Sequence, residues 1–148
     1  MSILQFWIGV AAETVVARAV DGGFAELNRG KAGPLERMRE GDGVAFYSPR
    51  TDASRSPPVQ AFTAIGRVAG GAIFQGPAQG ETSTFRRAVQ YLPAKPAPIK
   101  PLIDELAFIR NKTHWGAPFR FGVVRVDARD FGRIAAAMGR DFEADFHA

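Results

Sequence analysis

The chain has 148 residues and a formal net charge of +4, 46% of its residues are hydrophobic, and it contains no cysteine. This length predicts one domain with one substantial core, and the apolar fraction excludes a disordered polypeptide. The lack of cysteine excludes disulfides, thiolate zinc sites and cysteine nucleophiles. The first residues contain neither a basic segment nor an apolar run long enough for a signal peptide or membrane span, so we expect a cytoplasmic protein.

Positive charge is concentrated in the second half of the chain. Between Thr82 and Arg125 there are eight Lys or Arg residues and two acidic residues. Such a segment suits an anionic partner, but a solvated basic face has the same composition, and charge alone leaves both interpretations open. Residues 139–148 are acidic instead, and we expect them to form a tail outside a core that spans about residues 4–138.

Apolar periodicity and turn residues divide the first half of the chain into short elements. Gly22 and Gly23 end a helix whose apolar side chains recur on one face, and Pro34 begins a second, shorter helix. Between residues 50 and 58 a polar loop with two consecutive prolines excludes regular structure. In chain order we expect a buried strand over 3–11, helices over 13–20 and 34–39, and strands over 44–47 and 61–68.

The second half of the chain continues with short strands and two more helices. Asp127 is a candidate cap for the last helix, Asp130 follows as a shortened capping box, and Gly139 ends it. In chain order we expect strands over 72–75 and 85–92, a stiff proline-rich linker over 93–98, a helix with its apolar stripe over 102–109, an irregular basic and aromatic segment over 110–120, a strand over 121–126 and a helix ending near Met138.

These elements do not alternate in βαβ order, and no internal repeat is visible. About five or six short strands with four short helices indicate a single α+β domain over residues 1–148, with a mostly antiparallel, barrel-like sheet. Glycines within predicted strands, such as Gly66 and Gly122, fit the sharp bends of a small barrel.

Common catalytic patterns are missing from the sequence. His147 is next to last, and His114 has no second histidine or carboxylate at metal-ligand spacing. Asp104 and Glu105 are neighbours on a predicted helix, so they point apart and cannot act as an acid–base dyad. No serine lies in a GxSxG context, and the glycine-rich stretches match neither a Walker A loop nor a dinucleotide fingerprint. We therefore expect no metal, no cofactor and no common hydrolase or NTPase activity.

The sequence does contain aromatic residues close to cations. The segment FAELNRGKAGPLERMREGDGVAFYSP, from Phe24 to Pro49, predicts one wall of a ligand pocket, and the basic segment 110–120 predicts the opposite wall. Phenylalanines on strands of a small domain are usually core residues. Trp7, Tyr47 and Trp115 carry polar groups that need partners, so we expect these rings to converge on one concave pocket.

The order of several segments resembles the EVE domain family, small bacterial and archaeal proteins of the PUA-like superfamily that are related to YTH domains. The Phe24–Pro49 segment precedes QAFTAIGRV and FRRAVQYLP, and the stretches FIRNKTHWG and RFGVVRV follow. The resemblance runs from Leu4 to Met138. It implies a PUA-like pseudo-barrel with short surrounding helices and a pocket that holds a flipped, modified nucleobase.

The resemblance also suggests site residues by their position. Aromatic walls would stack on the base, polar groups would read its edge, and a basic rim would hold the backbone. The base-pocket candidates are Trp7, Phe24, Asn28, Lys31, Tyr47, Ser48 and Trp115. The basic-rim candidates are Arg29, Arg50, Arg110 and Lys112. Many family members carry Trp or Cys where this chain reads FAELN, which leaves the preferred modification open.

Four functions are consistent with these features. The first is a non-catalytic, DNA-binding reader of a modified base, and the second is a PUA-like RNA-binding module. The third is a small enzyme that acts on a nucleotide or acyl substrate with His114 as its base, and the fourth is an interaction domain with a merely solvated basic face. The expected partner is thus nucleic acid and not a membrane, and the sequence leaves the oligomeric state open.

Overall fold

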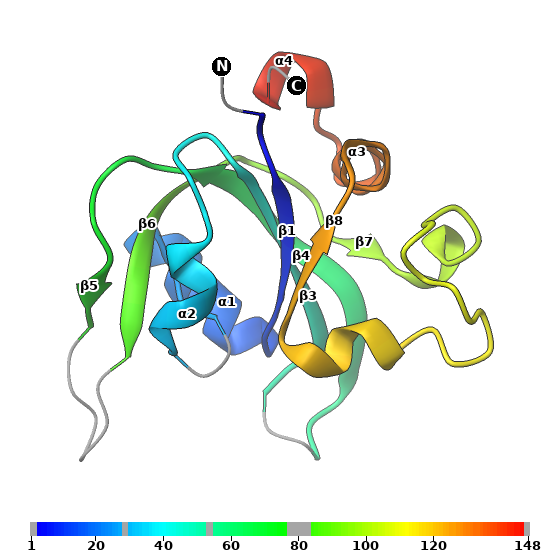
Figure 1. The fold of residues 1–148 in the computed structure, drawn as a ribbon. Helices are drawn as coiled ribbons and strands as arrows, with labels where there is room; N and C mark the ends of the chain where they lie inside the picture. Colours follow the sequence, from blue (N-terminus) through cyan, green and yellow to red (C-terminus); the bar gives the residue numbers. More distant parts are fainter. Residues whose placement is uncertain (1–2, 28–29, 53–54, 77–83, 147–148) are drawn as a thin grey trace.

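The computed structural model describes residues 3–27, 30–52, 55–76 and 84–146, and within them one mixed sheet curves into a half-barrel with short helices around it (Figure 1). The strands are β1 (Phe6–Val10), β2 (Phe24–Ala25), β3 (Gly43–Arg50), β4 (Pro58–Val68), β5 (Phe74–Gln75), β6 (Phe85–Tyr91), β7 (Ala97–Pro98) and β8 (Val123–Val126). The helices are α1 (Glu13–Gly22), α2 (Ala32–Glu36), α3 (Ala128–Ala137) and α4 (Phe142–Phe146), with 3-10 helices η1 (Lys100–Leu102) and η2 (Ala117–Phe121).

The sheet is mostly antiparallel, as the sequence predicts, and its one parallel pair among the described strands is β1 with β3. Its main path runs β2-β6-β4-β3-β1-β8, while β5 pairs with β6 and β7 pairs with β4. Strand β1 is parallel to β3 and antiparallel to β8, so the N-terminal strand lies between two strands from distant parts of the chain. The expected α+β, barrel-like fold class is confirmed.

Alternation along the strands sends side chains into two separate clusters, one on each face of the sheet. On β1, Phe6 and Ile8 join the cluster that α3 and α4 cover, whereas Trp7 joins the cluster beneath α1 and α2. On β3, Tyr47 lies on the α3 side and Phe46 on the α1 side. Figure 1 shows these two pairs of helices on opposite sides of the central strands.

Gly66 allows two strands to approach closely. A Cβ atom at this position would lie 2.6 Å from the carbonyl oxygen of Gln90 and 2.9 Å from the Cα of Tyr91, both on β6. The predicted role of Gly66 as a bending point thus corresponds to a backbone contact between β4 and β6. Gly122 instead has φ 77° and ends η2 immediately before β8, so it is a helix cap and not a strand residue.

Several helix signals in the sequence are confirmed at the level of atoms. Gly23 ends α1 with φ 70°, and its N–H donates to carbonyls of the last turn. Asp127 caps α3 by accepting a hydrogen bond from the Asp130 N–H at 2.8 Å. These caps satisfy backbone groups that a helix end leaves without partners.

The helix expected over 102–109 does not form. Only η1 is helical there, and turns follow it, although Leu102, Leu106 and Ile109 are buried as their apolar spacing suggests. The buried carboxylate of Asp130 accepts hydrogen bonds from the N–H groups of Ala107 and Phe108. Those two N–H groups are then no longer free for helical bonds, so a residue from α3 overrides the local helical pattern.

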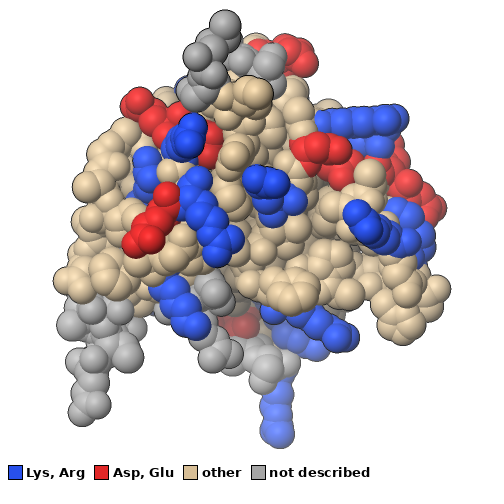
Figure 2. Space-filling model, viewed as in Figure 1, with Lys and Arg blue, Asp and Glu red and all other residues tan. Residues whose placement is uncertain are grey.

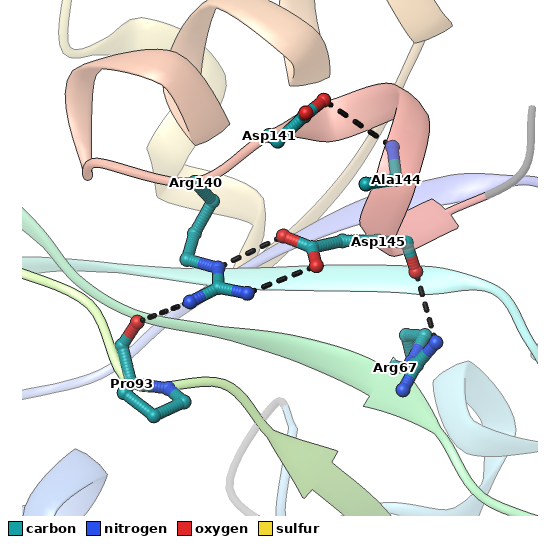
Figure 3. A network of polar contacts seen from close by, with 6 residues as sticks. All are labelled: Arg67, Pro93, Arg140, Asp141, Ala144 and Asp145. Carbon is teal, nitrogen blue, oxygen red and sulfur yellow. Dashed lines mark hydrogen bonds and ion pairs between the residues drawn. The ribbon is translucent and has the colours of Figure 1, made fainter.

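Residues 139–146 of the acidic C-terminal segment belong to the folded core rather than to a tail. Phe146 of α4 is buried, and its ring lies 5.1 Å from that of Phe131 between centroids. Arg140 binds both carboxylate oxygens of Asp145 and donates to the carbonyl of Pro93, as Figure 3 shows. The boundary expected near Met138 would therefore cut through the core.

The ion pair between Arg140 and Asp145 also fixes the charge state of the carboxylate. Its shortest contact, from Arg140 Nε to Asp145 Oδ2, is 2.8 Å. Hydrogen bonding to Arg140 lowers the pKa of Asp145 below its ordinary value.

Among the described residues, no helix is long and apolar enough to cross a membrane.

Candidate functional site

A cavity of about 180 Å³ lies between α1 and the strands that it covers. Its walls come from four parts of the chain: the end of β1 with α1, the β2 segment, β3, and the start of β6. The described lining residues are Ala11, Val15, Val16, Arg18, Ala19, Phe24, Glu26, Phe46, Thr84 and Arg86. One wall is thus aliphatic, one is aromatic, and the charged side chains come from Arg18, Glu26 and Arg86.

Backbone pairing holds the aromatic wall in place. Strand β2 is short, but Phe24 and Ala25 pair with Ala88 and Arg87 of β6. The hydroxyl of Tyr91 donates a hydrogen bond of 2.8 Å to the carbonyl of Phe24, and burial raises the pKa of Tyr91. A phenol with a raised pKa remains protonated, so it can serve as this donor at neutral pH.

The charged side chains of the cavity form a small network. Arg86 Nε lies 2.6 Å from Glu26 Oε1, and the Thr84 hydroxyl donates to the same oxygen at 3.0 Å. The guanidinium carbon of Arg86 stands 3.9 Å from the centre of the Phe24 ring, which is a cation–π contact. The side chains of Arg86 and Glu26 are each about one-fifth exposed, so solvent and ligands can reach them.

Of the base-pocket candidates from the sequence, Phe24 lines this cavity. Trp7 and Ser48 do not line it and instead make hydrogen bonds within the core. Trp7 is buried, and its indole N–H donates to Asp42 Oδ2 at 3.1 Å. Ser48 is buried against Thr63, with 2.7 Å between the hydroxyl oxygens. Lys31 is exposed just before α2. Asn28 lies outside the described residues, and so does the rim candidate Arg29.

Tyr47 and Trp115 approach each other, but on the opposite face of the sheet from Trp7. The Tyr47 ring stacks on Phe119 at 4.2 Å between centroids and meets the half-buried Trp115 edge-on at 6.5 Å. Desolvation raises the pKa of Tyr47 to about 12. The three rings therefore do not converge on one pocket as expected, because odd and even positions of the strands face different clusters.

The remaining basic-rim candidates lie apart from the cavity lining. Arg50 is exposed and donates to the carbonyl of Ser56. The Lys112 ammonium donates to the carbonyls of Ile103 and Leu106, so it ties its own loop together. Arg110 is exposed and lines a separate shallow groove beside η2.

Sequence reasoning did not single out Arg18, Glu26, Thr84 and Arg86 as site residues, because isolated polar residues in or beside short elements are usually solvated. One signal could have found part of the set. Phe24 and Glu26, and likewise Thr84 and Arg86, are two residues apart, so each pair shares a face in extended chain.

In the described part of the chain, the His, Asp and Glu residues form no group of three that could hold a metal ion. His114 is exposed, and its Nδ1 lies 3.4 Å from the side-chain nitrogen of Asn111, outside the cavity lining.

Proteins of similar sequence identify the family of this chain. The family model described as "EVE domain" matches residues 5–137. The chain belongs to the EVE domain family. Among curated relatives, UPF0310 protein msl3206 of Mesorhizobium japonicum is 45% identical over 136 residues, which cover 90% of this chain and 91% of the relative. A UPF0310 protein of Mycolicibacterium gilvum is 44% identical over 135 residues, or 91% of this chain and 96% of the relative.

Solved structures of distant sequence share the fold. The crystal structure of protein Atu2648 from Agrobacterium tumefaciens has a TM-score of 0.53 and 13% identity, and the match covers 92% of this EVE domain chain and 94% of that chain. The NMR structure of Rpa0253 from Rhodopseudomonas palustris has a TM-score of 0.57 and 14% identity, with the same coverage of 92% and 94%. These likenesses extend over the half-barrel and its helices, and they bear on the fold alone.

Proposed function

We propose that this EVE domain protein is a non-catalytic nucleic-acid-binding protein whose cavity beneath α1 takes one extruded, modified base of DNA. The observation that carries the proposal is the cavity itself, with the Phe24 ring and the Glu26–Arg86 pair in its wall. Membership in a family with a PUA-like fold and the excess of basic residues between Thr82 and Arg125 support the same function.

The size of the cavity suits a single ring system. Its volume of about 180 Å³ is smaller than the roughly 300–1,000 Å³ typical of pockets for drug-sized ligands. A nucleobase that has left its stack needs a flat apolar surface and a few polar groups for its edge. Phe24 and the aliphatic side of α1 supply the apolar surface, and Glu26 and Thr84 supply polar groups.

The carboxylate of Glu26 suggests which bases bind best. A carboxylate accepts hydrogen bonds from the exocyclic amino group of cytosine, and adenine presents a similar amino group. Thymine and uracil present a carbonyl oxygen at that edge, which a carboxylate repels. We therefore propose an amino-bearing base, cytosine or adenine with a small modification, as the ligand.

The make-up of the cavity also supports a binding function over catalysis. Its described lining contains one carboxylate, Glu26, which is engaged by Arg86 and Thr84, and no histidine. A general acid–base mechanism needs a group that can exchange a proton near neutral pH. Replacing His114 with Ala tests the enzymatic alternative, since turnover that depends on this residue would contradict the proposal.

Binding of short oligonucleotides tests the proposed function directly. The probes carry cytosine, C5-methylated cytosine, C5-hydroxymethylated cytosine, adenine or N6-methylated adenine at one central position, in DNA and in RNA of the same sequence. We expect tighter binding to a modified probe than to its unmodified counterpart, and weaker binding as salt concentration rises. Equal affinity for all bases, without salt dependence, would overturn the proposal, and a preference for RNA would assign the RNA-binding alternative.

A matched pair of arginine variants distinguishes a specific contribution of the cavity to binding from a general effect of positive charge. Arg18 lines the cavity from α1, whereas Arg129 is an exposed helical arginine on α3, outside that lining. Arg18→Ala and Arg129→Ala remove the same charge, so they change the net charge of the protein equally. We expect only Arg18→Ala to reduce the preference for the modified base, and an equal loss in both variants would place recognition elsewhere.

A further inference from the structure

A second concave surface lies beside η2 and β8, on the other side of the β1 end from the cavity. It is an open groove of about 530 Å³, nearly three times the volume of the cavity. Its described lining consists of Phe108, Arg110, Asn111, His114, Ala117, Pro118, Phe121, Val123, Val124 and Arg125. No acidic residue occurs in that lining, and its two formal charges, on Arg110 and Arg125, are both positive.

Phe121 is the most unusual residue of the groove. Its side chain is 76% exposed, although a phenylalanine normally gains stability by burial. It ends η2, where Gly122 turns the chain into β8 with a positive φ. Figure 2 shows an uncharged area over η2 and the lower part of β8, with Lys or Arg side chains above and below it. An exposed ring in the same groove as two arginines suits a base and its flanking phosphates.

A backbone hydrogen bond links the segments that line the groove and the cavity. The N–H of Val10, at the end of β1, donates to the carbonyl of Gly122 at 2.9 Å. The next residue along the chain, Ala11, lines the cavity, and the neighbours of Gly122, Phe121 and Val123, line the groove. The two surfaces therefore have lining residues next to both ends of this hydrogen bond, at the end of β1.

We propose that this groove binds the single-stranded nucleotides next to the extruded base, with Phe121 stacking on a base and Arg110 and Arg125 contacting phosphates. The proposal rests on the proposed function, since it names a second contact for the same nucleic acid. Stacking on one exposed ring does not discriminate among bases. The groove thus contributes affinity, and the cavity contributes the choice of base.

The test uses oligothymidylate and oligouridylate of about nine nucleotides, since stacking grooves accept any base and cover about 4–16 nucleotides. We expect Phe121→Ala to weaken binding of these probes about tenfold or more, in line with the measured value of one base–aromatic stack. Ile3→Ala is the matched control, because Ile3 is also an exposed apolar residue but lies outside the groove. Both side chains are exposed, so both variants should fold as the wild type does.

Salt dependence tests the two arginines. Arg110→Ala and Arg125→Ala should each reduce the slope of log affinity against log salt by about one, because each removes one phosphate contact. Arg129→Ala, outside the groove, should leave that slope unchanged. Unchanged affinity in Phe121→Ala together with unchanged slopes in both arginine variants would overturn the proposal, as would a wild-type protein that binds neither probe.

The outcomes for the groove and the cavity can be told apart. Phe24→Ala should abolish the preference for a modified base while oligothymidylate binding persists, and Phe121→Ala should weaken all probes without changing that preference. If Phe24→Ala alone has an effect, the cavity function stands and the groove assignment fails. If wild-type protein dimerises and Phe121→Ala is monomeric with unchanged nucleic acid binding, the groove binds a second copy of the chain, and the proposal fails.

Discussion

The guanidinium carbon of Arg86 lies 3.9 Å from the centre of the Phe24 ring, and the same side chain is paired with Glu26. Arg86 therefore covers one face of the Phe24 ring. Under the proposed function, a base would either stack on the guanidinium plane or displace it. Displacement would separate Arg86 from its ionic partner Glu26.

The strength of this pair is open to direct measurement. Because both side chains are partly exposed, we expect a coupling energy of about 0–1 kcal/mol between Arg86→Ala and Glu26→Gln, typical of ion pairs near a surface. Urea denaturation of the two single variants and the double variant gives this coupling. A coupling above about 2 kcal/mol would mean that the pair is held as rigidly as a buried one, and displacement by a ligand would then be unfavourable.

Gly66→Ala should destabilise the protein by about 1–3 kcal/mol, because the added Cβ would overlap the backbone of β6. Thermal or urea denaturation measures the loss. Gly33→Ala is the control, since a Cβ at Gly33 meets no atom within 4 Å and Gly33 lies in α2. That change should be neutral or slightly stabilising, as alanine favours a helix over glycine. Equal effects of the two substitutions would argue against the close contact between β4 and β6.

Alkaline pH should destabilise the fold through its buried phenols. Burial raises the pKa of Tyr47 to about 12, above the ordinary value of about 10. A raised pKa in the folded state means that stability is fully present below about pH 10 and is lost as pH rises toward about 12. Tyrosinate absorbance should therefore appear late in a titration, and Tyr47→Phe should reduce the loss of stability. Ordinary titration of Tyr47 near pH 10 would contradict its burial against Phe119.

Acid should weaken the attachment of α4. Pairing with Arg140 lowers the pKa of Asp145, so this contribution to stability is complete above the ordinary carboxyl value of about 3.9 and is lost as pH falls through the lower, folded value. Asp145→Asn should remove that part of the acid dependence, whereas Glu143→Gln, at an exposed position of the same helix, should retain it. Melting temperatures of the three proteins between neutral and acid pH give the comparison.

Local signals in the sequence were sufficient for much of the fold. Glycine after an apolar helical face predicts the end of α1, and Asp127 predicts the start of α3, because caps depend on residues within one turn. Local signals failed where a distant residue intervenes. The Asp130 carboxylate accepts hydrogen bonds from the N–H groups of Ala107 and Phe108, and the sequence around residue 107 does not predict these bonds.

The candidate site was harder to predict for the same reason. Its charged residues Arg18, Glu26 and Arg86 come from α1, the β2 segment and β6, and only the folded sheet brings them together. Trp7 was expected in the pocket because its indole needs a partner. That partner is Asp42, 35 positions away in sequence, so the polar group is satisfied inside the core. Resemblance to a family predicts the fold, whereas the cavity depends on contacts between distant segments that form only in the folded chain.

The placement of β1 has a consequence for how the chain is made. Phe6 of this strand pairs with Gly43 on one side and with Val126 on the other, so its second partner, β8, is the last of the described strands to be synthesised (Figure 1). Until β8 has been synthesised, the apolar strand FWIGV has one unpaired edge. An unpaired apolar edge is a template for association with other chains. A strand that is paired on both edges in the finished sheet thus has a free edge in the nascent protein, and slowing synthesis of the last third of the chain should increase aggregation.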